Sequence, residues 1–151
     1  VEVREFNFSV WPGYLTSIRQ HENDVLMCAE INHKIMRQET ILHIMTRARE
    51  SARGNFQSAC RAEVIGLTVL TDYNNNTYRI DDIDFDVNPT STFESKKDKT
   101  QISYKDYYKN RYGITIREER QPLLVTRSKA RSRRAGDDEI IYLVPELCRA
   151  T

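Results

Sequence analysis

Residues 67–83 read LTVLTDYNNNTYRIDDI, and this stretch decides the fold class. β-branched and aromatic residues on both sides of three consecutive asparagines favour two strands, Leu67–Tyr73 and Thr77–Ile83. Asparagine tolerates the positive φ that a tight turn needs, so the asparagines predict the turn between these strands. Alternation along the second strand places Tyr78 and Arg79 on opposite faces. We therefore predict an antiparallel hairpin near the middle of the chain.

Two helices are predicted immediately before this hairpin. Apolar residues between Ile41 and Ala52 recur at helical spacing, and Gly54 offers a stop after them. Asn55 can cap a second helix that continues to Val64, because its side-chain oxygen can accept a backbone N–H of the first turn.

Two more strands, Tyr14–Gln20 and Val25–Ile31, are predicted upstream around the turn Glu22-Asn23-Asp24. Trp11-Pro12-Gly13 is interpreted as a break, since proline and glycine interrupt regular structure. We therefore expect a linker segment at 1–13 and one domain at 14–151.

Downstream of the hairpin, Thr92–Glu94 and Thr100–Ile102 are predicted to pair with each other. Ser103 then has the capping-box spacing of a helix start, and Gly113 suits the position just past the helix end. The last predicted strands are Leu123–Arg127 and Glu139–Val144.

This order of strands, two helices, strands, one short helix and strands predicts the α+β class. A small, partly closed barrel is the natural way to hide the edges of so many short strands. The hairpin and helix of residues 92–113 would form an appendage inserted into that barrel.

Hydrophobic residues make up 39% of the 151 residues and charged residues 30%, which is typical of one soluble globular domain. No apolar run approaches the roughly 18 residues of a membrane span. The three cysteines are odd in number and far apart, which excludes a disulfide framework or a zinc pattern. We expect buried, reduced thiols in an intracellular protein.

Charge is distributed unevenly along the chain. The formal net charge is +1, but residues 96–134 contain 13 Lys and Arg against 4 Asp and Glu, a local balance of +9. This asymmetry predicts a local anionic partner. The basic loop Arg127–Arg134 could serve as a nuclear signal or a phosphate patch, although a solvated loop is the interpretation we favour.

The most informative functional stretch is Tyr104–Tyr112, which contains four tyrosines among lysines and an arginine. Helical spacing places Tyr104, Tyr108 and Tyr112 on one face. An amphipathic packing helix is one interpretation, but buried phenols need hydrogen-bond partners. Hydroxyls beside cations suit phosphate oxygens, and aromatic rings offer stacking surfaces to bases. The stretch therefore favours binding of single-stranded nucleic acid.

Metal binding and catalysis find no support in the sequence. Asp82, Asp84 and Asp86 suggest a calcium loop, but that pattern requires glycine and glutamate where the chain has Val87 and Phe93. The three histidines lack metal-ligand spacing, and no Ser/His/Asp grouping is indicated. We expect no metal, no cofactor and no catalytic residue.

Five motifs in this order resemble the PAZ domain of the PIWI branch of the Argonaute family. The motifs are Trp11-Pro12-Gly13-Tyr14, Leu70–Arg79, Asp106–Tyr112, Gln121–Leu124 and Pro145–Cys148. The resemblance implies a barrel related to OB and SH3 barrels, with two helices on one side and a hairpin-plus-helix appendage. It also implies a cleft between barrel and appendage that holds the single-stranded 3′ end of a small guide RNA.

The resemblance further implies roles for individual side chains. Tyr107 and Tyr112 match tyrosines that contact terminal phosphate groups, and Phe93 matches the aromatic under which the last nucleotide stacks. An apolar wall that includes Leu143 would welcome the 2′-O-methyl group that piRNA-type guides carry. The complete expected RNA-binding set is Tyr73, Tyr78, Arg79, Phe93, Tyr107, Tyr108, Arg111, Tyr112, Tyr142 and Leu143.

By this resemblance, the chain is a non-catalytic module that anchors a piRNA-type guide for RNA-guided silencing. It would act beside other domains of a longer Argonaute-family protein, in the cytoplasm and its germ granules or in the nucleus. One alternative is the PAZ domain of a Dicer-type nuclease, which the Trp11 and Pro145 motifs disfavour. Another is a barrel that binds methylated protein tails, but an aromatic cage has no use for a basic tyrosine helix.

Overall fold

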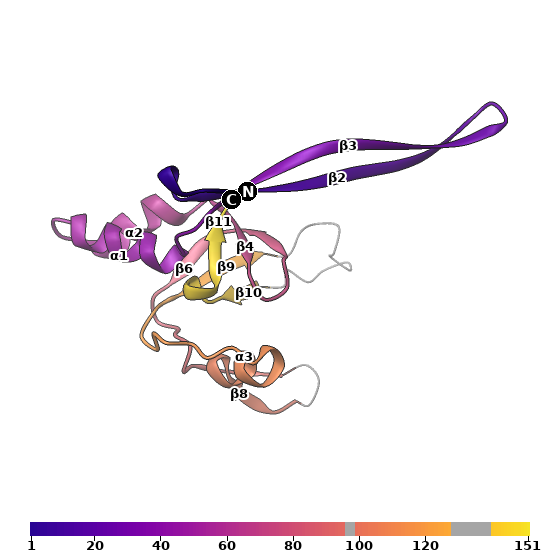
Figure 1. The fold of residues 1–151 in the computed structure, drawn as a ribbon. Helices are drawn as coiled ribbons and strands as arrows, with labels where there is room; N and C mark the ends of the chain where they lie inside the picture. Colours follow the sequence, from indigo (N-terminus) through magenta and orange to yellow (C-terminus); the bar gives the residue numbers. More distant parts are fainter. Residues whose placement is uncertain (96–98, 128–139) are drawn as a thin grey trace. The chain divides into compact units, whose positions relative to one another are not determined.

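The computed structural model describes residues 1–95, 99–127 and 140–151 (Figure 1). The chain folds as two compact units, Val1–Gln38 together with Thr151, and Glu39–Ala150. The first unit is a long β-ribbon. The second contains the helices α1 to α3, the short strands that follow them in the chain, and every residue of the predicted RNA-binding set.

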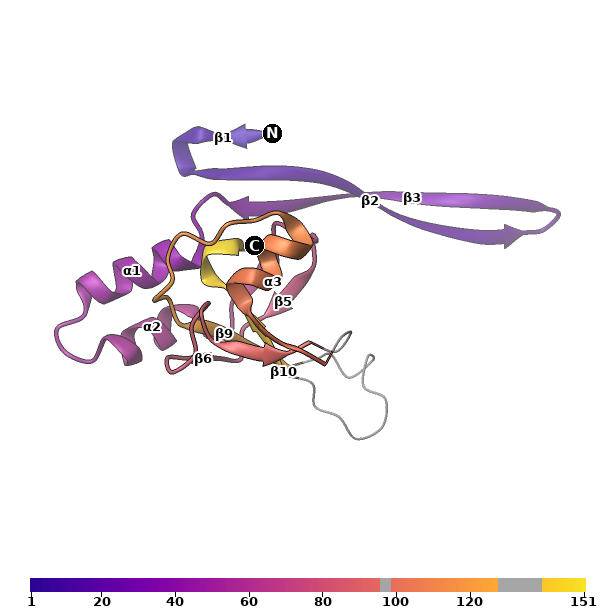
Figure 2. The same ribbon diagram turned by 90° about the horizontal axis from the view of Figure 1, so that it is seen from below.

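Two long strands form the ribbon, which is visible in Figures 1 and 2 as a paired, twisted hairpin. β2 (Phe8–His21) pairs antiparallel with β3 (Asp24–Arg37) over the full length of both strands. The short β1 (Glu2–Val3) and a 3₁₀ turn, Arg4–Phe6, precede them. The two predicted strands are therefore confirmed, but they are much longer than the sequence indicated.

The predicted break at Trp11-Pro12-Gly13 is wrong, because Pro12 lies inside β2 and pairs with His33 of β3. Proline removes one backbone donor, and an edge strand tolerates that loss where its outer side has no partner strand. Within the described residues, β1 covers the outer side of β2 only at Phe8 and Ser9. The boundary expected after residue 13 falls inside β2, whereas the boundary between the two compact units falls between Gln38 and Glu39.

Both predicted helices of the second unit are confirmed. α1 (Ile41–Ser51) begins after Thr40, whose side chain accepts the backbone N–H of the third helical residue. α2 (Phe56–Val64) begins after Asn55, whose side-chain oxygen accepts two backbone N–H groups of the first turn. The two helices lie side by side at one side of the strands (Figure 1).

The remaining strands form two three-stranded antiparallel sheets. The first has the order β11-β4-β5 and consists of Cys148–Ala150, Thr68–Thr71 and Thr77–Arg79. The second has the order β10-β9-β6 and consists of Ile140–Leu143, Leu123–Arg127 and Asp82–Asp84. The asparagine hairpin is confirmed as β4 and β5, with Asn75 at a φ of 56°.

One predicted strand is divided between the two sheets. β5 ends at Arg79, and the end of the predicted strand Thr77–Ile83 belongs instead to β6, which continues to Asp84. The switch is fixed at Asp81, whose N–H donates to Val125 and whose carboxylate accepts the N–H of Arg127 at 2.8 Å. The Asp81 side chain thus supplies a hydrogen bond to β9 at the point where the chain leaves the β11-β4-β5 sheet and enters the β10-β9-β6 sheet.

A single main core joins the two helices to both sheets. Fully buried residues come from each of these elements, including Ile41, Val64, Val69, Ile83 and Leu124. Burying the inner faces of both sheets in one core is what a small barrel-like β-structure requires. The predicted α+β class is confirmed.

The predicted appendage is also confirmed. β7 (Thr92–Glu94) pairs with β8 (Gln101–Ser103), and α3 (Tyr104–Tyr112) follows directly. The Ser103 hydroxyl accepts the N–H of Asp106, and Gly113 ends the helix at a φ of 67°. In Figure 1, α3 and β8 lie on a different side of the sheets from α1 and α2.

The thiols follow the sequence expectation only in part. All three cysteines are free, and Cys60 and Cys148 are buried, but Cys28 is exposed on β3. Burial raises the pKa of the Cys148 thiol. Among the described residues, no helix combines the length and the apolar character needed to cross a membrane.

Candidate nucleic-acid interface

Tyr108 attaches α3 to the rest of the second unit. Its ring is only 3% exposed and belongs to a second buried cluster with Ile116, Leu123 and Val144. Its hydroxyl lies 3.2 Å from the hydroxyl of Tyr73, in the loop after β4, and the two rings meet edge to face at 5.1 Å. Burial raises the pKa of both phenols.

Two further tyrosines of α3 pack around this pair. The ring centroids of Tyr73 and Tyr112 are 4.7 Å apart, and Tyr107 contacts Tyr108 at 5.4 Å and Tyr112 at 6.2 Å. Tyr107 and Tyr112 are half-buried, so part of each side chain remains open to solvent. Burial, followed by the neighbouring Tyr112, raises the pKa of Tyr107.

The same network continues through the appendage hairpin to β10. Phe93 of β7 packs on Tyr104 at 4.5 Å and on Tyr107 at 5.5 Å. Tyr104 in turn meets Tyr142 of β10 at 6.1 Å, and the Tyr142 hydroxyl donates to Asp84. Burial raises the pKa of Tyr104 to about 12, with smaller contributions from Tyr142 and Asp84.

These contacts define one aromatic cluster drawn from α3, β7, β10 and the loop after β4. Its members are Tyr73, Phe93, Tyr104, Tyr107, Tyr108, Tyr112 and Tyr142. Six of them were in the predicted set, and Tyr104 was not. The signal for Tyr104 was present, because it shares the helical face of Tyr108 and Tyr112.

Four predicted residues lie outside the aromatic cluster: Arg111, which flanks it, and Tyr78, Arg79 and Leu143. Tyr78 is half-buried against the main core, and its phenol adds weakly to the raised pKa of Tyr73 after the larger effect of burial. Arg79 is exposed and points to the opposite face of β5, as the alternation predicted. Leu143 is 1% exposed within the main core, so the structure does not bring its side chain to the surface of the site.

Cations flank the exposed side of the aromatic cluster. The Arg111 guanidinium lies 5.6 Å from the centre of the Tyr112 ring, and its Nε donates to the Tyr112 hydroxyl at 3.3 Å. Lys105 is paired with Glu119. Within the part of the chain that the structure describes, Lys109 and Arg111 have no carboxylate partner. Both side chains are exposed, and exposed cations of this kind suit an anionic ligand.

A carboxylate holds the segment that leads from α3 back to the sheets. Glu146, in the 3₁₀ turn Pro145–Leu147, accepts the backbone N–H groups of Arg117 and Glu118 and the side-chain amide of Gln121. The Gln121 oxygen accepts the N–H of Glu146 at 2.9 Å in return. This reciprocal arrangement fixes where the appendage joins the strands.

Two further expectations from the sequence concern metal binding and the basic loop Arg127–Arg134. Among residues 1–95, 99–127 and 140–151, no group of three or more His, Cys, Asp or Glu side chains is arranged to hold a metal ion. The basic loop Arg127–Arg134 lies outside the described residues, apart from Arg127 at the end of β9.

The family model described as "PAZ domain" matches residues 40–151. Over all 151 residues, the chain is 48% identical to protein aubergine and 48% identical to protein piwi, both of Drosophila melanogaster. It is 42% identical over 151 residues to the Piwi-like protein Siwi of Bombyx mori. The chain spans only 17–18% of the length of these relatives.

Solved structures show the same relationship. The crystal structure of Drosophila Piwi matches 99% of this chain and 18% of its own, with a TM-score of 0.61 and 46% identity. A structure of Giardia Dicer matches 88% of this chain and 20% of its own, with a TM-score of 0.52 and 19% identity, which shows a shared fold alone. The chain therefore belongs to the PAZ domain family and, within it, to the PIWI clade of the Argonaute family.

Proposed function

We propose that the aromatic cluster binds the single-stranded 3′ end of a small guide RNA of the piRNA type. The observation that carries this proposal is the gathering of phenol hydroxyls, half-exposed rings and flanking cations at one place on the appendage. Rings stack on bases and riboses, while hydroxyls and guanidinium groups suit phosphate oxygens. Tyr107, Tyr112 and Arg111 offer all three of these groups to one ligand.

Several residues of the predicted set have a supporting role in this proposal. Tyr108 is too deeply buried to touch RNA, and its hydroxyl instead orients Tyr73. Tyr78 and Arg79 remain candidates for the RNA backbone beside the cluster. The domain then acts as an anchor in a longer protein, and any cleavage of RNA belongs to another part of that protein. We place this anchoring in RNA-guided silencing, in the cytoplasm and its germ granules or in the nucleus.

Recognition of an end should depend little on base sequence, because stacking and backbone contacts do not read base edges. Short RNAs of different sequence should bind alike, and a 3′-terminal phosphate should weaken each of them about fivefold, the loss of roughly one hydrogen bond. Fluorescence anisotropy with paired oligonucleotides, free or phosphorylated at the 3′ end, measures this. Equal affinity of blocked and free ends would contradict the proposal.

We further propose that the site accepts a 2′-O-methyl group on the last ribose, beside the apolar faces of Phe93 and Tyr142. A methyl that leaves water there is worth about 0.8 kcal/mol if fully buried, which corresponds to roughly a three- to fourfold preference. Paired dissociation constants for RNAs that differ only in this methyl test the preference. Phe93→Ala should weaken the binding of both the methylated and the unmethylated RNA and reduce the difference between their affinities. Tighter binding of the unmethylated RNA by the unsubstituted chain would oppose the proposal.

A further inference from the structure

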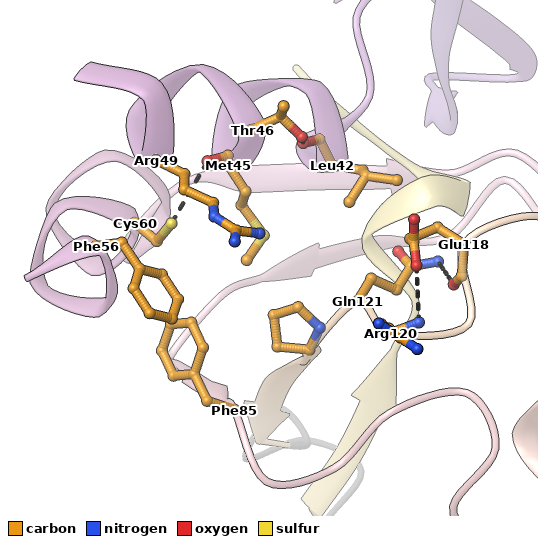
Figure 3. A pocket seen from close by; sticks show the side chains of 11 residues that line it. Leu42, Met45, Thr46, Arg49, Phe56, Cys60, Phe85, Glu118, Arg120 and Gln121 are labelled. Carbon is orange, nitrogen blue, oxygen red and sulfur yellow. Dashed lines mark hydrogen bonds between the residues drawn. The ribbon is translucent and has the colours of Figure 1, made fainter. Parts of the chain in front are cut away.

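A pocket of about 280 Å³ lies between α1, α2, the segment after β6 and the loop before β9 (Figure 3). None of its lining residues belongs to the aromatic cluster or to the predicted RNA-binding set. Leu42 and Met45 of α1 line one side, and Pro122 lines another. The pocket is therefore a second candidate site, lined by residues other than those of the aromatic cluster.

Two phenylalanines form an aromatic wall of the pocket. The rings of Phe56 and Phe85 meet edge to face at 5.9 Å, as Figure 3 shows from close by. Phe56 is 41% exposed although it stands in the first turn of α2, where a polar residue would serve the helix equally well. An exposed aromatic ring beside other apolar side chains is typical of a surface that binds another apolar group.

The neutral polar groups of the pocket are already satisfied within the chain. The Thr46 hydroxyl donates to the Leu42 carbonyl at 2.9 Å, and the Cys60 thiol donates to the Met45 carbonyl at 3.5 Å. The side-chain amide of Gln121 is held at both ends by its own neighbours. A nucleobase is read through hydrogen bonds on its edges. This lining has little to offer a base and suits an apolar body.

The charged groups of the pocket are not balanced. Arg49 lies over the Phe56 ring at 5.5 Å and, like Arg120, has no carboxylate partner among the described residues. By contrast, Arg47 of the same helix is paired with Glu39 at 3.0 Å. The one carboxylate in the lining, Glu118, accepts the backbone N–H of Arg120 at 2.9 Å. Two guanidinium groups therefore face one carboxylate, and the excess charge is positive.

We propose that this pocket binds a segment of a partner protein in which a large aromatic or aliphatic side chain stands next to a carboxylate. The volume of about 280 Å³ lies just below the range of small-molecule sites, which run from roughly 300 Å³ upward, and it fits a single anchoring side chain. The guanidinium groups of Arg49 and Arg120 bind the neighbouring carboxylate, because their planar donors match its two oxygens. Positive charge at the rim thus selects acidic partners.

Three capped peptides test the proposal on the intact chain: Gly-Asp-Phe-Asp-Gly, the same peptide with both aspartates replaced by asparagine, and the same peptide with alanine in place of phenylalanine. NMR signals of the Leu42 and Met45 methyl groups report binding in the pocket. We expect the first peptide to shift these signals. The asparagine peptide should bind about fivefold more weakly and the alanine peptide about tenfold more weakly.

Two protein variants distinguish the effect of the pocket charge from a general effect of removing an arginine from α1. Arg49→Gln should weaken binding of the aspartate peptide about fivefold and leave binding of the asparagine peptide unchanged. Arg47, on the same helix, is already paired with Glu39, so Arg47→Gln should change the affinity for neither peptide. Binding of a 3′-free RNA should be unaffected in both variants. The proposal is overturned if no peptide shifts the pocket signals, if aspartate and asparagine peptides bind equally, or if RNA shifts these signals in preference to the peptides.

Discussion

Replacing Tyr108 with alanine should lower the free energy of unfolding of the second unit by about 3–5 kcal/mol, the usual cost of removing a large buried aromatic ring. The ring is 3% exposed and contacts both Tyr73 and Tyr107, so the cavity would open at the join between α3 and the strands. We expect the appendage to detach and RNA binding to be lost with it. Denaturant unfolding followed by circular dichroism gives the energy, and hydrogen exchange of the α3 amides locates the loss.

Tyr108→Phe is the matched control for this prediction. It keeps the ring and removes only the hydroxyl, so it should cost about 0.5–1.5 kcal/mol, the net value of one hydrogen bond. Trp11 fluorescence is a poor probe of either variant, because Trp11 belongs to the first unit. If Tyr108→Ala unfolded at the denaturant concentration of the unsubstituted chain, Tyr108 would not be the attachment of α3 to the strands.

Local signals in the sequence were sufficient for the three helices of the second unit and for its asparagine hairpin. Asn55 and Ser103 cap their helices with their own side chains, and Asn75 adopts the positive φ that its turn requires. Each of these depends on a few neighbouring residues, which is why sequence alone predicts them. The division of the strand after Arg79 depends instead on Asp81 meeting β9, more than forty residues away in the chain. No local pattern contains that contact.

The first unit shows the opposite case, in which a local signal misleads. Pro12 was interpreted as an interruption, but its place on an edge strand makes the missing donor harmless. Whether a strand lies at an edge is a property of the sheet, so proline alone could not decide it. For the same reason β2 was predicted to begin only at Tyr14, whereas it begins at Phe8.

The candidate site was predictable as a set of residue types and less so as an arrangement. The run of tyrosines among cations identified α3, and the resemblance added Phe93 and Tyr142, which the structure brings to the same cluster. The sequence did not show which phenols would be buried supports. Tyr108 and Leu143 were expected to serve the ligand, and only the tertiary packing reveals that both are almost completely enclosed.

The half-exposed tyrosines of α3 should therefore carry most of the RNA affinity. Tyr107→Ala and Tyr112→Ala should each weaken binding of a 3′-free RNA by roughly 1–3 kcal/mol, the cost of one stacking or phosphate contact. Because 1.4 kcal/mol is about tenfold in affinity, the loss should be clear by fluorescence anisotropy. Tyr14→Ala is a matched control, since Tyr14 is an exposed tyrosine of the first unit.

Phenylalanine variants at the same two positions distinguish what the side chains do. If a ring stacks on a base or ribose, Tyr107→Phe should bind nearly as well as the unsubstituted chain. If the hydroxyl binds a phosphate oxygen, Tyr107→Phe should lose about as much RNA affinity as Tyr107→Ala does. For Tyr112, whose hydroxyl already accepts from Arg111 Nε at 3.3 Å, we expect the second result, because removing the hydroxyl also releases the guanidinium from its position beside the ring. If the alanine variants of both residues were folded and bound RNA as tightly as the unsubstituted chain, the RNA site would not lie on α3.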